Sequence, residues 1–258
     1  NLFIKDKNLS DYKVIVVGVS DDQLKKEINE REFKEIRSLI SPSKYIKHDM
    51  EYISILSALH KSIKKYNICK LISFHSRIEY AKDFSIYMTS FNDVINGQLK
   101  LNTDYIKGAM PTGTRLEKLS MLKNYEGYDS VMLSNARCLT EGINVPDLDA
   151  VAFIDPKQSP VDIVQAVGRA IRKNDEKKFG IIFLPLFIKQ EDYQKYKKNK
   201  QDLSAFVEEC PGYKNVVNII QALKSHDERL ILQLNELRTK KGQKPTSTGG
   251  GIGLPNVN

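Results

Sequence analysis

The chain has 258 residues, of which 41% are hydrophobic, so it can bury a sizeable core as one large domain or as a domain with an appendage. Its 40 Lys and Arg residues exceed its 32 Asp and Glu residues, and the net charge of +8 suits a polyanionic partner such as nucleic acid without requiring one. No apolar run approaches the ~20 residues of a membrane-spanning helix and nothing resembles a signal peptide, so the sequence predicts no membrane partner.

The cysteines predict neither a disulfide framework nor a metal site. Cys69, Cys138 and Cys210 are far apart in the sequence, odd in number and without a CxxC or Cys/His spacing. A reducing cytoplasm is the simplest location for such a chain. Because the first residue is Asn1 rather than Met, we also expect that the chain is a piece of a longer protein.

Short β-branched runs alternate with longer helical patterns over the first 190 residues. The predicted strands are 12–20, 69–76, 104–110 as a strand followed by a turn, 130–135, 150–155, and 179–187 with an interruption at Pro185. The predicted helices are 22–40, 49–66, 77–93, 114–125 and 159–173. Buried strands separated by helices are typical of an α/β fold with a mainly parallel sheet and helices on both of its faces.

The pattern changes after the alternating region, so we predict a domain over residues 1–190 and a helical extension over 191–240. The extension has helical periodicity and no strand candidate; it could pack on the preceding domain, couple to a neighbouring domain, or contact DNA through Lys195, Lys197, Lys198 and Lys200. Residues 241–258 are rich in Gly, Ser and Thr, which predicts a flexible tail or linker.

The stretch SPVDIVQAVGRAIRK, residues 159–173, predicts an amphipathic helix. Ser159 is a good N-cap, Pro160 suits the first helical position, and Asp162 follows in the first turn, where the helix dipole favours an anion. At about 100° per residue, one face carries polar donors within roughly 60° of one another and the opposite face is apolar. The donors are Gln165, Arg169 and Arg172, and the apolar residues are Ile163, Val164, Val167 and Ile171.

Gly168 lies beside this row of donors and costs about 1 kcal/mol of helix propensity relative to Ala, so we expect another chain or a ligand to approach closely there. A guanidinium group is always charged, and its rigid fork of donors suits phosphate oxygens. Two such groups on one face can clamp the phosphates of a nucleotide and act as arginine fingers, which stabilise charge during phosphoryl transfer. A solvated helix face is the alternative interpretation, because Arg and Gln are common on such faces.

Four stretches resemble motifs of the superfamily 2 helicases and translocases, in the correct order. QAVGRAIR (165–172) resembles motif VI, and LSNARCLTEGINVPDLDAVAFIDP (133–156) resembles motif V and its following strand in the restriction-enzyme-like branch. KLISFHSRIEYAKDF (70–84) resembles motif IV, and YIKGAMPTGTR (105–115) resembles the short strand between motifs IV and V. The resemblance implies the second, C-terminal RecA-like domain of a DEAD/DEAH-type helicase, with the P-loop NTPase fold.

The resemblance also implies roles for individual residues. Arg169 and Arg172 would reach the nucleotide of the first domain as arginine fingers, with Gln165 beside the same phosphates and the attacking water. The nucleotide-binding candidates are Gly142, Asn144 and Gly168, where Asn144 stands in a position that is often aspartate in the family. The candidates for contacts to the phosphate backbone of the nucleic acid are Ser76, Arg77, Gly108, Arg115, Asn135 and Arg137, and His75 is a weaker one.

The sequence contains neither a phosphate loop of the GxxxxGKS or GxxxxGKT type nor an acidic DExx strand end, because DERL at 227–230 falls in a helical pattern. We therefore expect ATP and Mg²⁺ to be held mainly by the first RecA-like domain of the same parent chain, and this chain alone to hydrolyse no ATP. The implied activity is that of an ATP-dependent helicase or translocase of restriction-modification type, acting on DNA rather than RNA, with methylase, specificity or nuclease domains as further partners. An RNA helicase, a remodelling ATPase and a non-catalytic nucleic-acid-binding module are the competing interpretations.

Overall fold

The structure is a computed structural model, and it describes residues 11–19, 24, 28–40, 49–95, 97, 99–124, 127–136, 148–155, 167–168, 179–187 and 213–226. The strands are β1 (Asp11–Val19), β2 (Lys70–His75), β3 (Leu101–Lys107), β4 (Ser130–Ala136), β5 (Ala150–Asp155) and β6 (Phe179–Phe187). The helices are α3 (Glu30–Ile40), α4 (Asp49–Tyr66), α5 (Ile78–Val94), α6 (Thr112–Met121) and α10 (Tyr213–His226).

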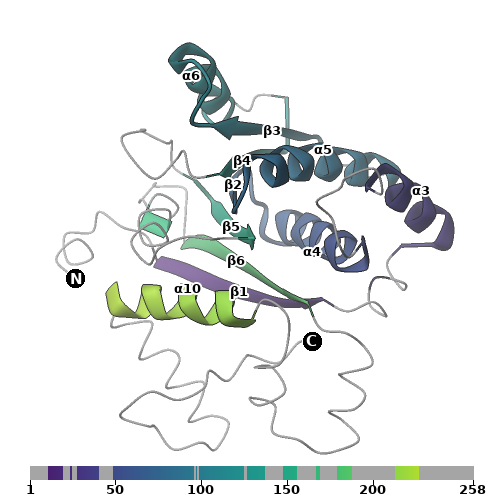
Figure 1. Cartoon of the computed structure of the whole chain (residues 1–258), viewed down its shortest axis with the longest axis horizontal. Coiled ribbons are helices and arrows are strands. Elements are labelled where there is room, and N and C mark those ends of the chain that lie inside the picture. Colours follow the sequence, from purple (N-terminus) through teal and green to yellow (C-terminus); the bar gives the residue numbers. More distant parts are fainter. Residues whose placement is uncertain are drawn as a thin grey trace, which may run out of the picture.

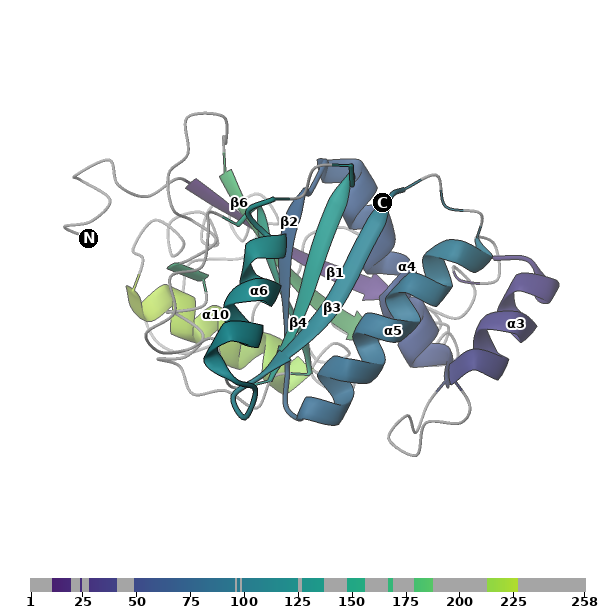
Figure 2. The ribbon, with the colours of Figure 1, turned by 90° about the horizontal axis from the view of Figure 1, so that it is seen from above.

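The six strands form one parallel sheet in the order β1-β6-β5-β2-β4-β3. Helices α4 and α5 cover one face of the sheet, and α6 and α10 lie on the other (Figures 1 and 2). Both faces are thus covered, as buried parallel strands require. The predicted α/β fold with a mainly parallel sheet between two layers of helices is confirmed.

Most predicted elements lie within a few residues of the observed ones, but three expectations were wrong. The helix predicted over 22–40 is interrupted at Ile28 and Asn29, and α3 begins only at Glu30. Strand β6 runs through Pro185, which pairs with Val17 of β1 instead of interrupting the strand. Proline is tolerated there because β5 pairs with β6 only as far as Phe183, so the missing N–H costs no bond of that ladder. Helix α6 ends at Met121, with Leu122 as its C-cap, rather than continuing to residue 125.

Two aspartates tie strands together at the amino edge of the sheet. The carboxylate of Asp129 accepts the backbone N–H of Lys100 at 2.9 Å, which links the starts of β3 and β4. The carboxylate of Asp149 accepts the backbone N–H groups of Cys69 at 2.9 Å and Lys70 at 2.7 Å, which links the starts of β2 and β5. Charge-assisted bonds of this kind are stronger than neutral ones and fix the register of neighbouring strands.

The main core lies between the sheet and helices α3, α4 and α5. Helix α3 begins with a reciprocal capping box, in which Asn29 and Glu32 exchange hydrogen bonds between side chain and backbone N–H at 2.9 and 3.0 Å. Phe84 of α5 and Tyr52 of α4 meet edge to face, with ring centroids 5.8 Å apart. The two helices and the sheet therefore share one apolar layer.

Helix α10 packs against β6 through its buried residues Val216, Ile219, Ile220, Ala222 and Leu223. This segment of the predicted helical extension is thus in contact with the sheet, and the remainder of 191–258 lies outside the described residues. Among the residues that the structure describes, no helix is both long enough and apolar enough to cross a membrane.

Candidate nucleic-acid interface

The carboxyl ends of four neighbouring strands bring most of the predicted nucleic-acid contacts to one edge of the sheet. Strands β5, β2, β4 and β3 are adjacent and parallel, so all four end at the same edge. Ser76 and Arg77 follow β2, Gly108 follows β3, and Asn135 is the penultimate residue of β4. Ligands of open parallel sheets bind at this edge, outside the carboxyl ends of the strands.

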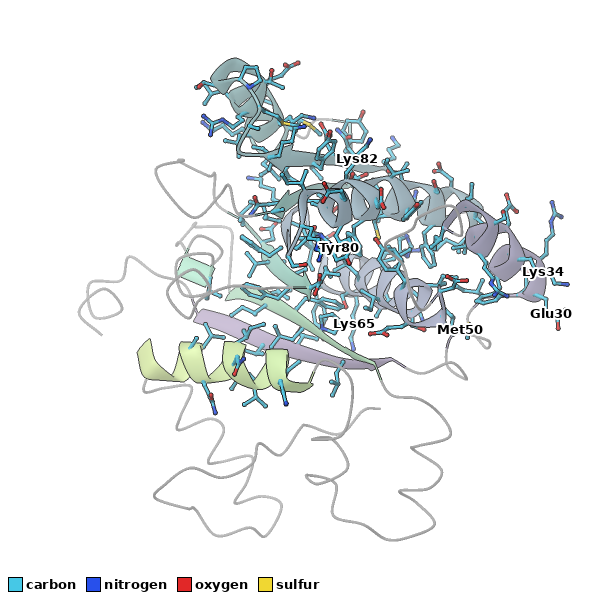
Figure 3. All side chains as sticks on the ribbon, in the orientation of Figure 1. Glu30, Lys34, Met50, Lys65, Tyr80 and Lys82 are labelled. Atoms are coloured by element: carbon cyan, nitrogen blue, oxygen red, sulfur yellow. The ribbon has the colours of Figure 1, made fainter. Side chains whose placement is uncertain are left out.

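Ser76 and Arg77 behave differently although they are neighbours. Ser76 is buried, with 7% of its surface exposed, and its hydroxyl donates a hydrogen bond to the carboxylate of Asp155 at the end of β5. Arg77 is exposed, has the extended backbone of an N-cap (φ −137°, ψ 152°), and makes no side-chain cap bond. Its guanidinium carbon lies 5.7 Å from the ring centroid of Tyr80, which Figure 3 marks on α5. Arg77 therefore presents an exposed charge at this corner, whereas Ser76 turns its hydroxyl inward.

Gly108 and Arg115 lie on either side of the turn between β3 and α6. Gly108 is exposed, and the backbone N–H of Met110 donates to the carbonyl of Lys107 at 3.2 Å to close the turn. Arg115 is half-buried; its Nη2 donates to the Thr112 hydroxyl at 3.3 Å, and its buried Nε has no hydrogen-bond partner among the described residues. The predicted pair of a glycine and a downstream arginine is thus brought together at the edge, with one arginine donor still to be satisfied.

Helix α6 is held against β3 by an ion pair. The ammonium of Lys118 contacts the carboxylate of Asp104 and lies 5.4 Å from the ring centroid of Tyr105. Leu119 and Leu122 are buried beneath the helix. These contacts hold the last turn of α6 against β3, and Arg115 lies one turn earlier on the same helix.

Asn135 and His75 lie inside the protein. Asn135 is fully buried at a register position between Phe74 of β2 and Ile106 of β3. His75 is 2% exposed, its Nε2 is 3.0 Å from the hydroxyl of Ser73, and its ring lies 4.9 Å from that of Phe84. Burial lowers the pKa of His75 to about 3, so the imidazole is neutral. The structure places His75 in the core, away from any exposed nucleic-acid surface.

Of the residues predicted to face the nucleotide, the structure describes only Gly168. Gly168 is helical and half-buried, and a Cβ added there would meet nothing within 4 Å among the described residues. Val167, predicted on the apolar face, is buried with 2% exposure. The other predicted site residues, namely Gln165, Arg169, Arg172, Gly142, Asn144 and Arg137, lie outside the described residues, and their roles stay predictions.

Asp155 is the member of this edge that the sequence did not reveal. In the sequence it reads only as the end of an apolar strand, AVAFID, followed by a proline. The alternation of Ser73 and His75 in β2 did carry a signal, because residues two apart on a strand share a face and two polar side chains on a buried face need partners. Their partner Ser134 on β4 could not be named before the strand order was known.

Comparisons with known proteins bear on the family and the fold of the chain. The family described as "Helicase conserved C-terminal domain" matches residues 52–174, which include β2 to β5 and Gly168. The "Probable helicase" of African swine fever virus is 36% identical over 88 residues, covering 33% of this chain and 10% of that protein. An ATP-dependent rRNA helicase of Debaryomyces hansenii is 28% identical over 168 residues, covering 62% of this chain and 26% of that protein.

One solved structure resembles nearly the whole chain. It is that of the ATP-dependent type ISP restriction-modification enzyme LlaBIII bound to DNA, with a TM-score of 0.72 and 29% identity over 94% of this chain. The chain spans 15% of that enzyme, and 10% of the viral helicase, so it corresponds to one part of much longer proteins. With the parallel sheet, the motif-bearing strand ends and these matches together, residues 52–174 are identified as the C-terminal, second RecA-like domain of a superfamily 2 helicase.

Proposed function

We propose that this domain is the second motor domain of an ATP-dependent DNA translocase or helicase of restriction-modification type. The observation that carries the proposal is the likeness over 94% of the chain to a DNA-bound type ISP restriction-modification enzyme. The exposed Arg77 and the half-buried Arg115 at the carboxyl edge support it, because guanidinium groups are suited to the phosphate backbone of a tracked strand. We place the parent protein in the cytoplasm, as the widely separated cysteines of this chain predict.

In this proposal ATP and Mg²⁺ are held mainly by the first RecA-like domain of the parent, and this domain supplies Arg169 and Arg172 to the phosphates and Gln165 beside them. Guanidinium donors fit a triphosphate, and among the described residues nothing lies within 4 Å of a Cβ added at the helical Gly168. Closure of the two domains on ATP would bring the arginines to the transferred phosphoryl group, where they stabilise developing charge. Methylase, specificity or nuclease domains are the further partners of such a parent.

The deciding experiment measures nucleic-acid-stimulated ATP hydrolysis by the parent protein. We expect Arg169→Ala and Arg172→Ala each to lower turnover on the order of 10³-fold, and Arg169→Lys to restore little, because lysine lacks the planar fork. Lys100→Ala, which removes a positive charge at the amino edge of β3, is the matched control and should leave turnover unchanged. Full turnover by both arginine variants, or ATP hydrolysis by the 258-residue chain alone, would contradict the proposed division of labour.

RNA is the second candidate substrate, because the chain is also similar to an ATP-dependent rRNA helicase. Contacts to a phosphate backbone carry little base information, so the same edge could track either strand. Stimulation of the parent ATPase by single-stranded DNA and by single-stranded RNA of the same sequence separates the two. A non-catalytic binding module would show binding without any stimulated hydrolysis.

A further inference from the structure

Two aspartates at the two ends of β5 clamp the same pair of strands, one at each edge of the sheet. Asp149, directly before β5, accepts the backbone N–H groups of Cys69 and Lys70 at the start of β2. Asp155, the last residue of β5, accepts the hydroxyl of Ser76 directly after the end of β2. The two clamps join the same strands, but only Asp155 lies at the edge that carries the predicted nucleic-acid contacts.

The pairing of β2 and β5 is irregular at the Asp155 end. Phe74 is opposite Phe153, but the next residue, His75, is opposite Asp155, so the register shifts by one residue between them. Bulges of this kind re-aim side chains at the ends of strands. Here the shift brings Asp155 level with the chain that leaves β2, where His75 is neutral and buried and the Ser76 hydroxyl meets the carboxylate.

We propose that Asp155 is a positioning residue for nucleic-acid binding: through Ser76 it fixes the chain between β2 and α5 so that Arg77 presents its guanidinium to a backbone phosphate. This inference rests on the proposed function, because it concerns the nucleic-acid contact of the same edge. Ser76 donates its hydroxyl hydrogen to Asp155, so in this arrangement it has none to donate to a phosphate. Arg77 follows directly in an extended conformation, exposed to solvent, so the orientation of its backbone depends on how Ser76 is held.

Because Asp155 is negatively charged, a positioning role can be distinguished from two alternatives, in which Asp155 acts only by its charge or the Ser76 hydroxyl itself binds the phosphate. A carboxylate beside a polyanion is repulsive, so if Asp155 acted only through its charge, removing it would strengthen binding. If the Ser76 hydroxyl itself bound phosphate, Ser76→Ala would weaken binding while Asp155→Ala would not. A positioning role requires both substitutions to weaken binding, and by the same amount, because they remove the same hydrogen bond.

The test is fluorescence anisotropy with the 258-residue chain and a fluorescein-labelled oligothymidine, repeated with oligouridine. We expect Asp155→Ala and Ser76→Ala each to weaken binding about tenfold, and the double variant to bind no more weakly than either alone. Asp155→Asn should retain most of the affinity, because the amide oxygen still accepts the Ser76 hydrogen although the charge is gone. The slope of log affinity against log salt should fall towards that of Arg77→Ala, because the contact that is weakened is the one between Arg77 and a phosphate.

Asp149→Ala is the matched control, since it removes the same charge and unclamps the same two strands at the opposite edge. It should lower the thermal stability yet leave the affinity of the folded protein unchanged, with circular dichroism confirming that every variant is folded. If Asp155→Ala bound as tightly as the wild type or more tightly, or if Asp149→Ala lost as much affinity as Asp155→Ala, the positioning role would be overturned while the proposed function would stand. A wild-type chain that binds neither oligonucleotide would overturn the proposed function and this inference with it.

Discussion

The hydroxyl of Ser73 on β2 donates a hydrogen bond to the hydroxyl of Ser134 on β4 at 2.9 Å, across the buried middle of the sheet. The two residues are paired in register, and the Nε2 of His75 lies 3.0 Å from the same Ser73 hydroxyl. All three side chains are buried, with at most 2% of their surface exposed. A buried polar row of this kind is stable only while its members find partners, and the imidazole can take part in its neutral form.

This row makes the stability of the domain depend on pH. Burial lowers the pKa of His75 from 6.5 to about 3 in the folded protein, so the unfolded chain binds the proton more readily. The stability due to the neutral imidazole is complete above about pH 6.5 and is lost as the pH falls towards 3, by up to about 1.4 kcal/mol for each pH unit. Urea unfolding between about pH 7.5 and about pH 4.5 measures this slope.

His75→Gln is the informative variant, because glutamine can still bond to Ser73 but does not titrate. We expect its free energy of unfolding to fall less steeply with acid than that of the wild type. A residual slope should remain, since burial also lowers the pKa of His60, which acts in the same direction. Identical slopes for His75→Gln and the wild type would show that His75 is not responsible.

Arg77 should contribute one phosphate contact to nucleic-acid binding. It is exposed at the carboxyl edge, and neutralising a phosphate releases a counterion. We expect Arg77→Ala to weaken binding to every sequence alike and to reduce the slope of log affinity against log salt by about one ion. Lys100→Ala removes an equal charge at the amino edge of the sheet, directly before β3, and should change neither the affinity nor the slope. A similar effect of both variants would show that Arg77 acts only through the net charge of the protein.

The fold could be predicted from the sequence because its strands are buried on both faces and its helices carry apolar stripes. Helix α4 matches its predicted range of 49–66, and the six strands fall where β-branched runs stand. The sequence predicted an interruption at Pro185 because proline has no backbone N–H to donate. Whether that missing donor breaks a strand depends on which neighbouring strand is paired at that residue. That information exists only in the sheet order.

Gly97 should be far less tolerant of a side chain than Gly113. A Cβ at Gly97 would lie 2.8 Å from the backbone oxygen of Asn92 and 2.4 Å from its Oδ1, the atom that lies 3.0 Å from the Nε2 of His60. Shifting Asn92 would also disturb its bond to the Leu99 carbonyl. We expect Gly97→Ala to lower the free energy of unfolding by about 1–3 kcal/mol, as overpacking does.

Gly113 provides the control for that substitution. It lies in the first turn of α6, where an added Cβ meets nothing within 4 Å among the described residues. Gly113→Ala should leave stability unchanged or raise it by up to about 1 kcal/mol, because alanine favours the helix. Thermal unfolding of both variants at one pH decides the comparison, and equal destabilisation would refute the steric argument.

The candidate site was less accessible to sequence reasoning than the fold. Residue types at strand ends indicated where Arg77, Gly108 and Arg115 stand, because parallel strands end at one edge. They could not indicate that the Ser76 hydroxyl is taken by Asp155, since 79 residues separate the two and a register shift aligns them. Hydrogen-bond competition within the protein decides which polar groups remain for a ligand, and it depends on the strand order.

Gly168→Ala should separate folding from function in the parent protein. Within the described residues an added methyl group meets nothing within 4 Å, and alanine is favoured over glycine in a helix by about 1 kcal/mol, so we expect the thermal stability of the 258-residue chain to stay the same or rise. The proposed closure on ATP brings another domain and its nucleotide to this helix, so the same methyl group should then lower nucleic-acid-stimulated ATP hydrolysis. Gly113→Ala on α6, where an added Cβ likewise meets nothing within 4 Å among the described residues, should leave hydrolysis unchanged. If Gly168→Ala were as active as the wild type, the space beside Gly168 would serve no approaching partner, and glycine there would have to be explained by the helix alone.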